Sequence, residues 1–283
     1  MKTSTKFITI ILLGVAIVYS SCQKAGIKAD DATNTTTTGT TTNSTAVGSQ
    51  IALSLAKSLA GQYGGTNINN GIKAPSSLQS THNGPSINGI YDLCGVSLDT
   101  TYNTTTLSHD TTNVLSGKLV FTYTCGSFGV NGYKVTDSIT TAAANASFYN
   151  TNTVVQNYIV TALDSTYLVV SMDGNINESI HNSTLNAGST VAYHNLVSQY
   201  VLNGVKVNYS TGYANMYVGT ASYTTTQTDF DPSVSATPGV NVYHGLITYL
   251  GNFMVTMTMQ INNQGPTYSY TINTATGATT LNP

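Results

Sequence analysis

From about residue 88 to the C-terminus, apolar and polar side chains alternate with a period of two over many short runs. In the run at 118–125, Leu119, Phe121 and Tyr123 occupy every second position. Successive residues of a strand point to opposite faces of a sheet. Thr, Val, Ile and Tyr, which dominate these runs, favour a half-buried pleated surface. The alternation therefore predicts a mainly β domain over residues 88–283.

Three dipeptides that favour type I′ turns lie between alternating runs: Asn131-Gly132, Asp173-Gly174 and Asn203-Gly204. They predict local, antiparallel connections, with a final hairpin at Thr276-Gly277. The expected strands lie near 89–98, 116–125, 132–141, 153–163, 166–172, 175–181, 189–202, 205–210, 215–226, 240–249, 252–262 and 267–273. This number of strands is too large for one flat open sheet, so we expect a sandwich or a strongly curled, barrel-like sheet.

One amphipathic helix is expected at 46–62, followed by an extended Gly-, Asn- and Pro-rich loop to residue 87. Its apolar stripe has a spacing of four residues and consists of Val47, Ile51, Leu55 and Leu59. We expect this stripe to pack on the β domain. The alternative is binding at a membrane surface, but Lys57 alone offers little attraction to anionic lipid.

The first 21 residues have the features of an export signal. Lys2 and Lys6 precede an apolar run at 7–18, which is shorter than the about 20 residues that a membrane-spanning helix needs. Small residues then precede Cys22, and this pattern resembles the lipobox of bacterial lipoproteins. The resemblance implies cleavage before Cys22 and attachment of fatty acyl chains, such as palmitate, to its sulfur. The alternative is an ordinary cleaved signal peptide followed by an unmodified cysteine.

Residues 22–45 are expected to form a flexible, Thr- and Asn-rich tether between the acylated Cys22 and the folded part. The segment 28–31, a lysine followed closely by two aspartates, resembles a surface-export tag of lipoproteins. We therefore expect an outer-membrane lipoprotein that faces the periplasm or the cell surface. A solvated tether with no sorting role would explain the same residues.

The chain as a whole resembles a group of lipoproteins from the envelope of diderm bacteria. The resemblance covers nearly the full length and rests on four segments: 59–65 (Leu-Ala-Gly-Gln-Tyr-Gly-Gly), 93–95 (Leu-Cys-Gly), 99–101 (Asp-Thr-Thr) and 121–125 (Phe-Thr-Tyr-Thr-Cys). It implies an outer-membrane or surface address and a β-rich fold. It assigns no activity to any residue.

Cys94 and Cys125 are the only cysteines beyond Cys22. In an oxidising envelope compartment, such a pair predicts a disulfide bond. Buried free thiols and a metal-binding pair are the alternatives. The sequence has no CxxC spacing, which argues against the metal.

Charged side chains are scarce, and all nine basic residues are lysines. Nucleic-acid binding needs clusters of basic residues, and the chain has none. No nucleophile, phosphate-binding or zinc-protease motif occurs, so we expect no catalytic residues, no metal and no cofactor. Asp229 and Asp231 could hold calcium, but a solvated turn explains them better. Glu178 and His181 are three residues apart, which predicts opposite faces of a strand and no shared metal.

These observations favour a non-enzymatic surface or structural module that contacts an envelope protein or a polysaccharide. Tyrosines on the strands, where exposed, would be contact residues; the alternative is that they simply fill the faces of the sheet. A first alternative is a carrier whose curled sheet encloses a hydrophobic ligand such as a lipid, with Met254, Met257 and Met259 lining the cavity. A second alternative is a glycan-active hydrolase, which needs two facing carboxylates. Few charges guard the strand edges, so self-association is also expected.

Overall fold

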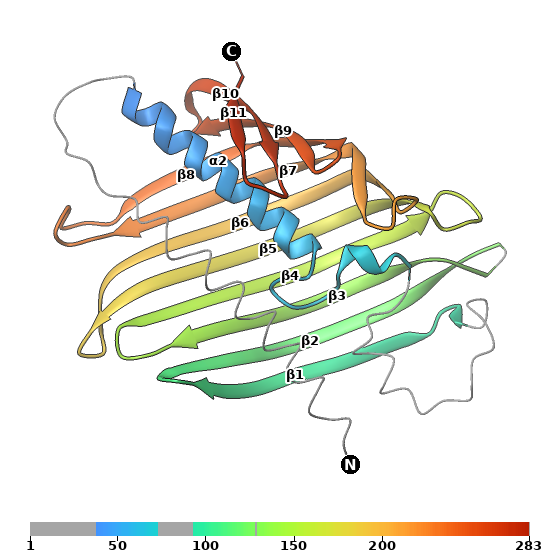
Figure 1. Ribbon diagram of the computed structural model, residues 1–283, viewed down its shortest axis with the longest axis horizontal. Coiled ribbons are helices and arrows are strands. Elements are labelled where there is room, and N and C mark those ends of the chain that lie inside the picture. The colour runs from blue at the N-terminus through green and yellow to red at the C-terminus, as the bar shows by residue number, and fades with distance from the viewer. Residues whose placement is uncertain (1–37, 73–92, 128, 283) are drawn as a thin grey trace. The chain divides into compact units, whose positions relative to one another are not determined.

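The computed structural model describes residues 38–72, 93–127 and 129–282 (Figure 1). The chain divides into a short unit, Met1–Asn43, and a main unit, Ser44–Pro283. The main unit contains the whole sheet and most of the one long helix among the described residues. The signal peptide, Cys22 and the first part of the expected tether lie outside the described residues.

The main unit is built on one antiparallel sheet of eleven strands, in which each strand pairs with the next in sequence (Figure 1). The strands are β1 (Ser97–Ser108), β2 (Thr111–Gly126), β3 (Gly129–Ala144), β4 (Phe148–Ala162), β5 (Val169–Asn186), β6 (Ser189–Asn208), β7 (Asn215–Phe230), β8 (Gly239–Gly251), β9 (Met254–Ile261), β10 (Gln264–Asn273) and β11 (Thr279–Leu281). The mainly β, antiparallel fold is therefore confirmed. The sheet is not closed and the described strands form no second sheet, so the expected sandwich does not form.

The three dipeptides expected to form turns lie inside strands instead. Asp173-Gly174 belongs to β5 and Asn203-Gly204 to β6, and the strand register shifts at each of them. Asn131-Gly132 lies within β3, at the point where the pairing of β3 with β2 shifts its register. The positive φ angle of Gly204, 57°, belongs to a β-bulge in β6, and Gly174, whose φ angle is 144°, lies opposite that bulge. Four expected strands therefore merge into two long ones.

The hairpin turns use other residues, many of which also have positive φ angles. Two-residue turns lie at His109-Asp110, Ala187-Gly188, Asn252-Phe253 and Asn262-Asn263. The expected final hairpin is present, because Gly277 lies between β10 and β11. Strand β1 differs from expectation, since it begins near the end of the expected strand at 89–98 and continues through a Thr-rich segment. Threonine suits a strand even where both of its faces are solvated.

The expected helix is α2, which spans Thr38–Leu59 and so begins eight residues before residue 46. Part of the expected tether is therefore helical. Extending a formed helix costs much less than starting one, so the packed segment can propagate into a Thr-rich sequence. The predicted apolar stripe is confirmed, because Val47, Ile51, Leu55 and Leu59 are at most 3% exposed. No helix of the described segments is long and apolar enough to cross a membrane.

From Ser44 onward, α2 lies diagonally across one face of the sheet (Figure 1). Near its start, Ser44 accepts a hydrogen bond from Tyr270 of β10, at 2.8 Å. Farther along, the Ile51 carbonyl accepts from Tyr200 of β6, at 3.0 Å. Near its end, the Ser58 carbonyl accepts from the amide of Gln156 in β4, at 2.9 Å. The hydrophobic core lies between this helix and the sheet.

The loop after α2 continues over the same face of the sheet as far as the structure describes it. It contains a short 3₁₀ helix, η2 (Ile68–Asn70), whose Ile68 is buried. The Ile68 carbonyl accepts a hydrogen bond from Tyr209, and the Asn69 side chain accepts one from the backbone of Ala214. The expectation of a loop packed over the domain therefore holds up to residue 72.

Candidate functional site

The two faces of the sheet have different chemistry. We call the face that packs against α2 the inner face; Val135, Tyr158 and Tyr200 point to it and are buried. The side chains that alternate with them, such as Lys134 and Asn157, form the outer face and are exposed. Among the described residues, no helix covers the outer face (Figure 1). This face is therefore the larger surface that the described fold offers to a partner.

One end of the outer face carries no Asp, Glu or Lys over three consecutive cross-strand rows from β2 to β8. We call it the neutral region. Its rows follow from the strand register and are Thr112, Ala144, Tyr149, Ser183, Tyr193 and Phe230; then Val114, Ala142, Thr151, His181, Asn195, Thr228 and Val240; then Ser116, Thr140, Thr153, Ser179, Val197, Thr226 and Val242. Hydroxyl groups, amides and aliphatic side chains dominate it.

Four rings run in a line across the neutral region, one from each of β4 to β7. Tyr149 lies 6.0 Å from His181, His181 lies 6.1 Å from Tyr193, and Tyr193 lies 5.5 Å from Phe230, measured between ring centroids. We call these four residues the aromatic row. A hydrogen bond between His181 Nδ1 and the Asn195 side chain fixes the imidazole. Tyr149 is 43% exposed, and the other three are half-buried.

The aromatic row combines apolar ring surface with polar groups at its margin. Aromatic side chains lose little conformational entropy on binding and dominate many contact surfaces. The surrounding threonines, serines and asparagines can donate and accept hydrogen bonds. The lack of lysines gives no attraction to phosphate groups. The site is therefore suited to a neutral partner that has both apolar and hydroxyl surface.

The sequence alone did not single out this row. Most tyrosines expected to be exposed on the strands face inward, and Tyr133, Tyr158, Tyr200 and Tyr270 are at most 1% exposed. For these tyrosines the alternative is confirmed, because they fill the inner face of the sheet. A residue belongs to the row only if its side chain lies on the outer face. Bulges change which residues of a strand face outward, so the face cannot be counted from the sequence alone. Only the cross-strand register reveals the row.

Two carboxylates share the inner face, but α2 and the loop after it cover them. Asp137 lies beneath Gly65 and Glu178 beneath Ser54, and both acids are at most 3% exposed. They lie on β3 and β5, with β4 between these strands. A hydrolase would need such a pair to face a substrate. Glu178 and His181 lie on opposite faces of β5, as their spacing predicted.

Asp229 and Asp231, the two aspartates considered for calcium, bind different side chains. Asp229 binds His194 Nδ1 at 2.5 Å and also accepts a hydrogen bond from the Gln227 side chain. Asp231 accepts hydrogen bonds from the backbone and the hydroxyl of Ser233, as expected for a turn. The described residues contain no group of three His, Cys, Asp or Glu side chains suited to a metal.

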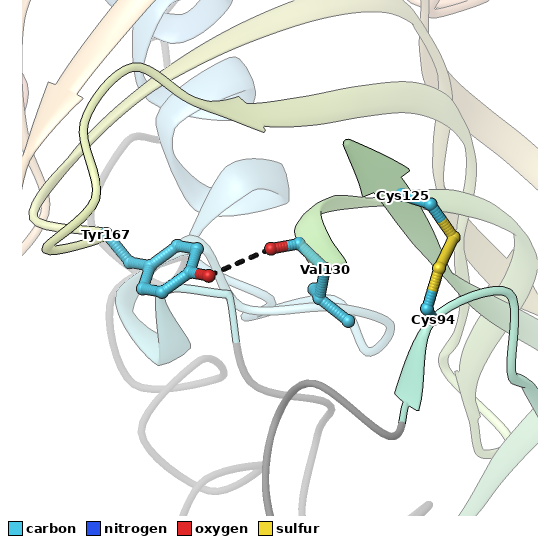
Figure 2. The surroundings of a disulfide bond; sticks show 4 residues. All are labelled: Cys94, Cys125, Val130 and Tyr167. Atoms are coloured by element: carbon cyan, nitrogen blue, oxygen red, sulfur yellow. Dashed lines mark hydrogen bonds between the residues drawn. A yellow bond between two sulfur atoms is a disulfide. The ribbon is translucent and has the colours of Figure 1, made fainter. Parts of the chain in front are cut away.

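Cys94 and Cys125 form the predicted disulfide, with their Cα atoms 5.3 Å apart (Figure 2). The bond ties the segment before β1 to the end of β2. Nearby, the hydroxyl of Tyr167 donates to the Val130 carbonyl at 2.9 Å (Figure 2). These contacts brace the end of the sheet opposite the aromatic row, so the disulfide has a structural role.

The methionines named for a carrier cavity lie on the inner face or near it. Met257 and Met259 are fully buried, and Met254 is half-buried. The backbone of Gly48 in α2 lies close to the sulfur of Met257. Helix α2 thus occupies the apolar surface that a carrier would use for its ligand, and the carrier stays a prediction without support from these contacts.

Comparison with protein-family models, curated proteins and solved structures finds no match to this chain. A function must therefore be inferred from the geometry of the site. The inner face is occupied by the helix and its contacts. The outer face, with the aromatic row at one end, remains as the surface for binding.

Proposed function

We propose that this protein is a non-enzymatic module of the cell envelope that binds a neutral polysaccharide on the outer face of its sheet. In this proposal, acyl chains on Cys22 hold the protein in the outer membrane, and the sheet presents the aromatic row to the ligand. The single observation that carries the proposal is the aromatic row within a region free of charged side chains.

The chemistry of the neutral region favours a polysaccharide over a protein partner. Sugar rings present apolar C–H surface, which packs on aromatic side chains, and a dense set of hydroxyl groups. Threonine, serine and asparagine side chains match these hydroxyl groups as donors and acceptors. Protein interfaces are typically enriched in arginine as well as aromatic residues, and the chain has no arginine. An envelope protein is the competing partner and an outcome of the test below.

The test uses the chain from residue 23 onward, which lacks the proposed anchor, produced in an oxidising compartment. Binding is measured by calorimetry to neutral hexasaccharides of glucose, mannose and xylose, with an anionic hexagalacturonate for comparison. We expect a neutral hexasaccharide to bind and the anionic one to bind more weakly. Binding of none of the neutral sugars, or capture of an envelope protein instead, would contradict the proposal.

Variants assign the binding to the aromatic row. The double variant Tyr149→Ala/Tyr193→Ala removes two rings and should weaken binding at least tenfold, which corresponds to about 1.4 kcal/mol. The double variant Tyr149→Phe/Tyr193→Phe keeps the rings and should retain most of the affinity. Asn157→Ala changes an exposed position of the outer face outside the neutral region and serves as the control. Equal affinity of all three variants would place the site elsewhere.

The anchor is tested separately in the full chain. Cells fed an alkyne analogue of palmitate should label the wild-type protein, and the label should fractionate with the outer membrane. Cys22→Ser should abolish the label and release the protein in soluble form. Labelling of the Cys22→Ser variant would contradict the proposed attachment site.

A further inference from the structure

The C-terminal half of α2 rests on an acid that the proposed function does not use. The Ser54 hydroxyl donates a hydrogen bond to Glu178 on β5, and Glu178 is 2% exposed. Within the described segments, Lys57 of α2 is the cation that acts on this carboxyl, and Ser58, Asn152 and the Tyr200 phenol also face it. A carboxylate taken out of water is strongly destabilised unless an opposite charge pairs closely with it.

A second buried acid supports the turn that follows the helix. Asp137 on β3 accepts a hydrogen bond from the backbone N–H of Gln156 at 3.0 Å, and its other oxygen faces Gly65. A Cβ atom at Gly65 would lie 2.5 Å from that oxygen, so the turn is in close contact with the acid. The Tyr158 phenol is its titratable neighbour, and no cation acts on Asp137 among the described residues.

Hydrogen bonds of Gln156 and Thr66 connect the end of α2 to the turn that follows it. The Gln156 amide donates to the Ser58 carbonyl at 2.9 Å, and its oxygen accepts from the Thr66 hydroxyl at 2.9 Å. The Thr66 hydroxyl also bonds the Tyr158 phenol at 2.7 Å. Both ends of the segment 54–66 are therefore held by polar groups beside an acid, and a change at either acid affects the same segment.

We propose that residues 54–66 form a pH-responsive clasp, which is docked on the sheet when Asp137 and Glu178 are protonated and loosens when both are ionised. The protonated acids are neutral and can remain buried. The ionised acids gain free energy from water, and water reaches them only if the segment lifts. The proposal goes beyond the binding function, because it concerns the face of the sheet opposite the aromatic row.

The direction of the pH effect follows from the buried environment. Burial raises the pKa of Asp137 to about 7 and that of Glu178 to about 7, against hydrogen bonds that lower both. In an unfolded chain, both acids titrate near pH 4. A carboxyl with a raised pKa adds stability that is complete below pH 4 and is lost as the pH rises through 7. The clasp therefore loosens between mildly acidic and mildly alkaline pH.

Hydrogen exchange on the chain from residue 23 onward tests the clasp at pH 5.5 and pH 8.5, after correction for the intrinsic exchange rate. We expect the protection of amides in 54–66 to fall at least tenfold at pH 8.5, while protection in the centre of β6 and β7 stays constant. Equal protection of 54–66 at both pH values would overturn the proposal.

The variant Asp137→Asn/Glu178→Gln has nearly the same shape without the titration, so its protection should not change with pH. The same pH response in this variant would assign it to other groups. If the double variant does not fold, the ¹³C resonances of the two carboxyls in the wild-type protein provide the test. Titration near pH 7 supports the clasp, and titration near pH 4 overturns it.

Discussion

Gly174 holds two strands of the sheet at very close approach. Its φ angle is 144°, and a Cβ atom there would lie 2.4 Å from the Asn157 carbonyl oxygen and 2.5 Å from the Tyr158 Cα atom. Both atoms belong to the β4 backbone, which cannot move without breaking its pairing. This glycine therefore permits the close pairing of β4 and β5 opposite the bulge at Asn203-Gly204 of β6.

Gly174→Ala should lower the free energy of unfolding by about 2–4 kcal/mol, because it combines a strained φ angle with a backbone clash. Chemical denaturation monitored by circular dichroism measures the change. The control is Gly239→Ala, where the nearest atom to a new Cβ is 3.9 Å away and the φ angle is not strained. Equal stability of the two variants would show that the close approach of β4 and β5 does not require glycine at position 174.

The Cys94–Cys125 disulfide closes a loop with a sequence separation of 31 residues. In the chain-entropy model, a loop of that length contributes roughly 3–4 kcal/mol to stability. Cys94→Ala/Cys125→Ala should therefore lower the free energy of unfolding by about that amount. Reduction of the wild-type protein should have the same effect. No change on reduction would indicate that the thiols are free.

Helix α2 stabilises the sheet because its buried stripe fills the inner face. Leu55 is 1% exposed within this stripe, whereas Leu53, two residues earlier, is only half-buried. Truncation of a fully buried leucine leaves a cavity that the surrounding chain fills only in part. The helix is therefore a structural part of the domain, and the pH-dependent segment lies at its C-terminal end.

Leu55→Ala should lower the free energy of unfolding by about 2–5 kcal/mol. Leu53→Ala removes the same atoms from a half-buried site and should cost clearly less. Thermal and denaturant unfolding of both variants measures the difference. A larger effect at Leu53 would mean that the helix packs through another face.

The periodicity of the sequence predicted the β-rich class, the one long helix and the faces of several elements, but not all of their bounds or their connections. The stripe from Val47 to Leu59 predicted the buried side of α2, and the alternation in β2 predicted its inner face. The dipeptides Asp173-Gly174 and Asn203-Gly204 could not be assigned, since positive φ angles serve turns and bulges equally well. The aromatic row depends on the resulting register, so no local signal revealed it.

The main unit can be built on a single open sheet because only one face of that sheet needs covering. Thr, Ser and Asn side chains on the outer face are stable in water, so no second sheet is required. An open sheet also has two edges, here β1 and β11. Strand β1 is twelve residues long, contains no proline and has one charged residue, Asp99. Such an edge is poorly protected against pairing with another chain.

The chain from residue 23 onward should therefore associate as its concentration rises, with β1 at the contact. Thr104→Lys/Thr106→Lys adds two charges to exposed positions of β1 and should shift the protein toward the monomer. Sedimentation equilibrium from micromolar to millimolar concentration measures the association. A wild-type protein that stays monomeric over this range would contradict the prediction.

The central claim is that the protein acts through the outer face of its sheet. The most direct test is site-resolved hydroxyl-radical footprinting with and without polysaccharide purified from the envelope of the same cells. We expect protection of Tyr149, Tyr193 and Phe230, with no change at Phe253, which lies outside the neutral region. Protection confined to residues outside the neutral region, or no protection at saturating polysaccharide, would contradict it.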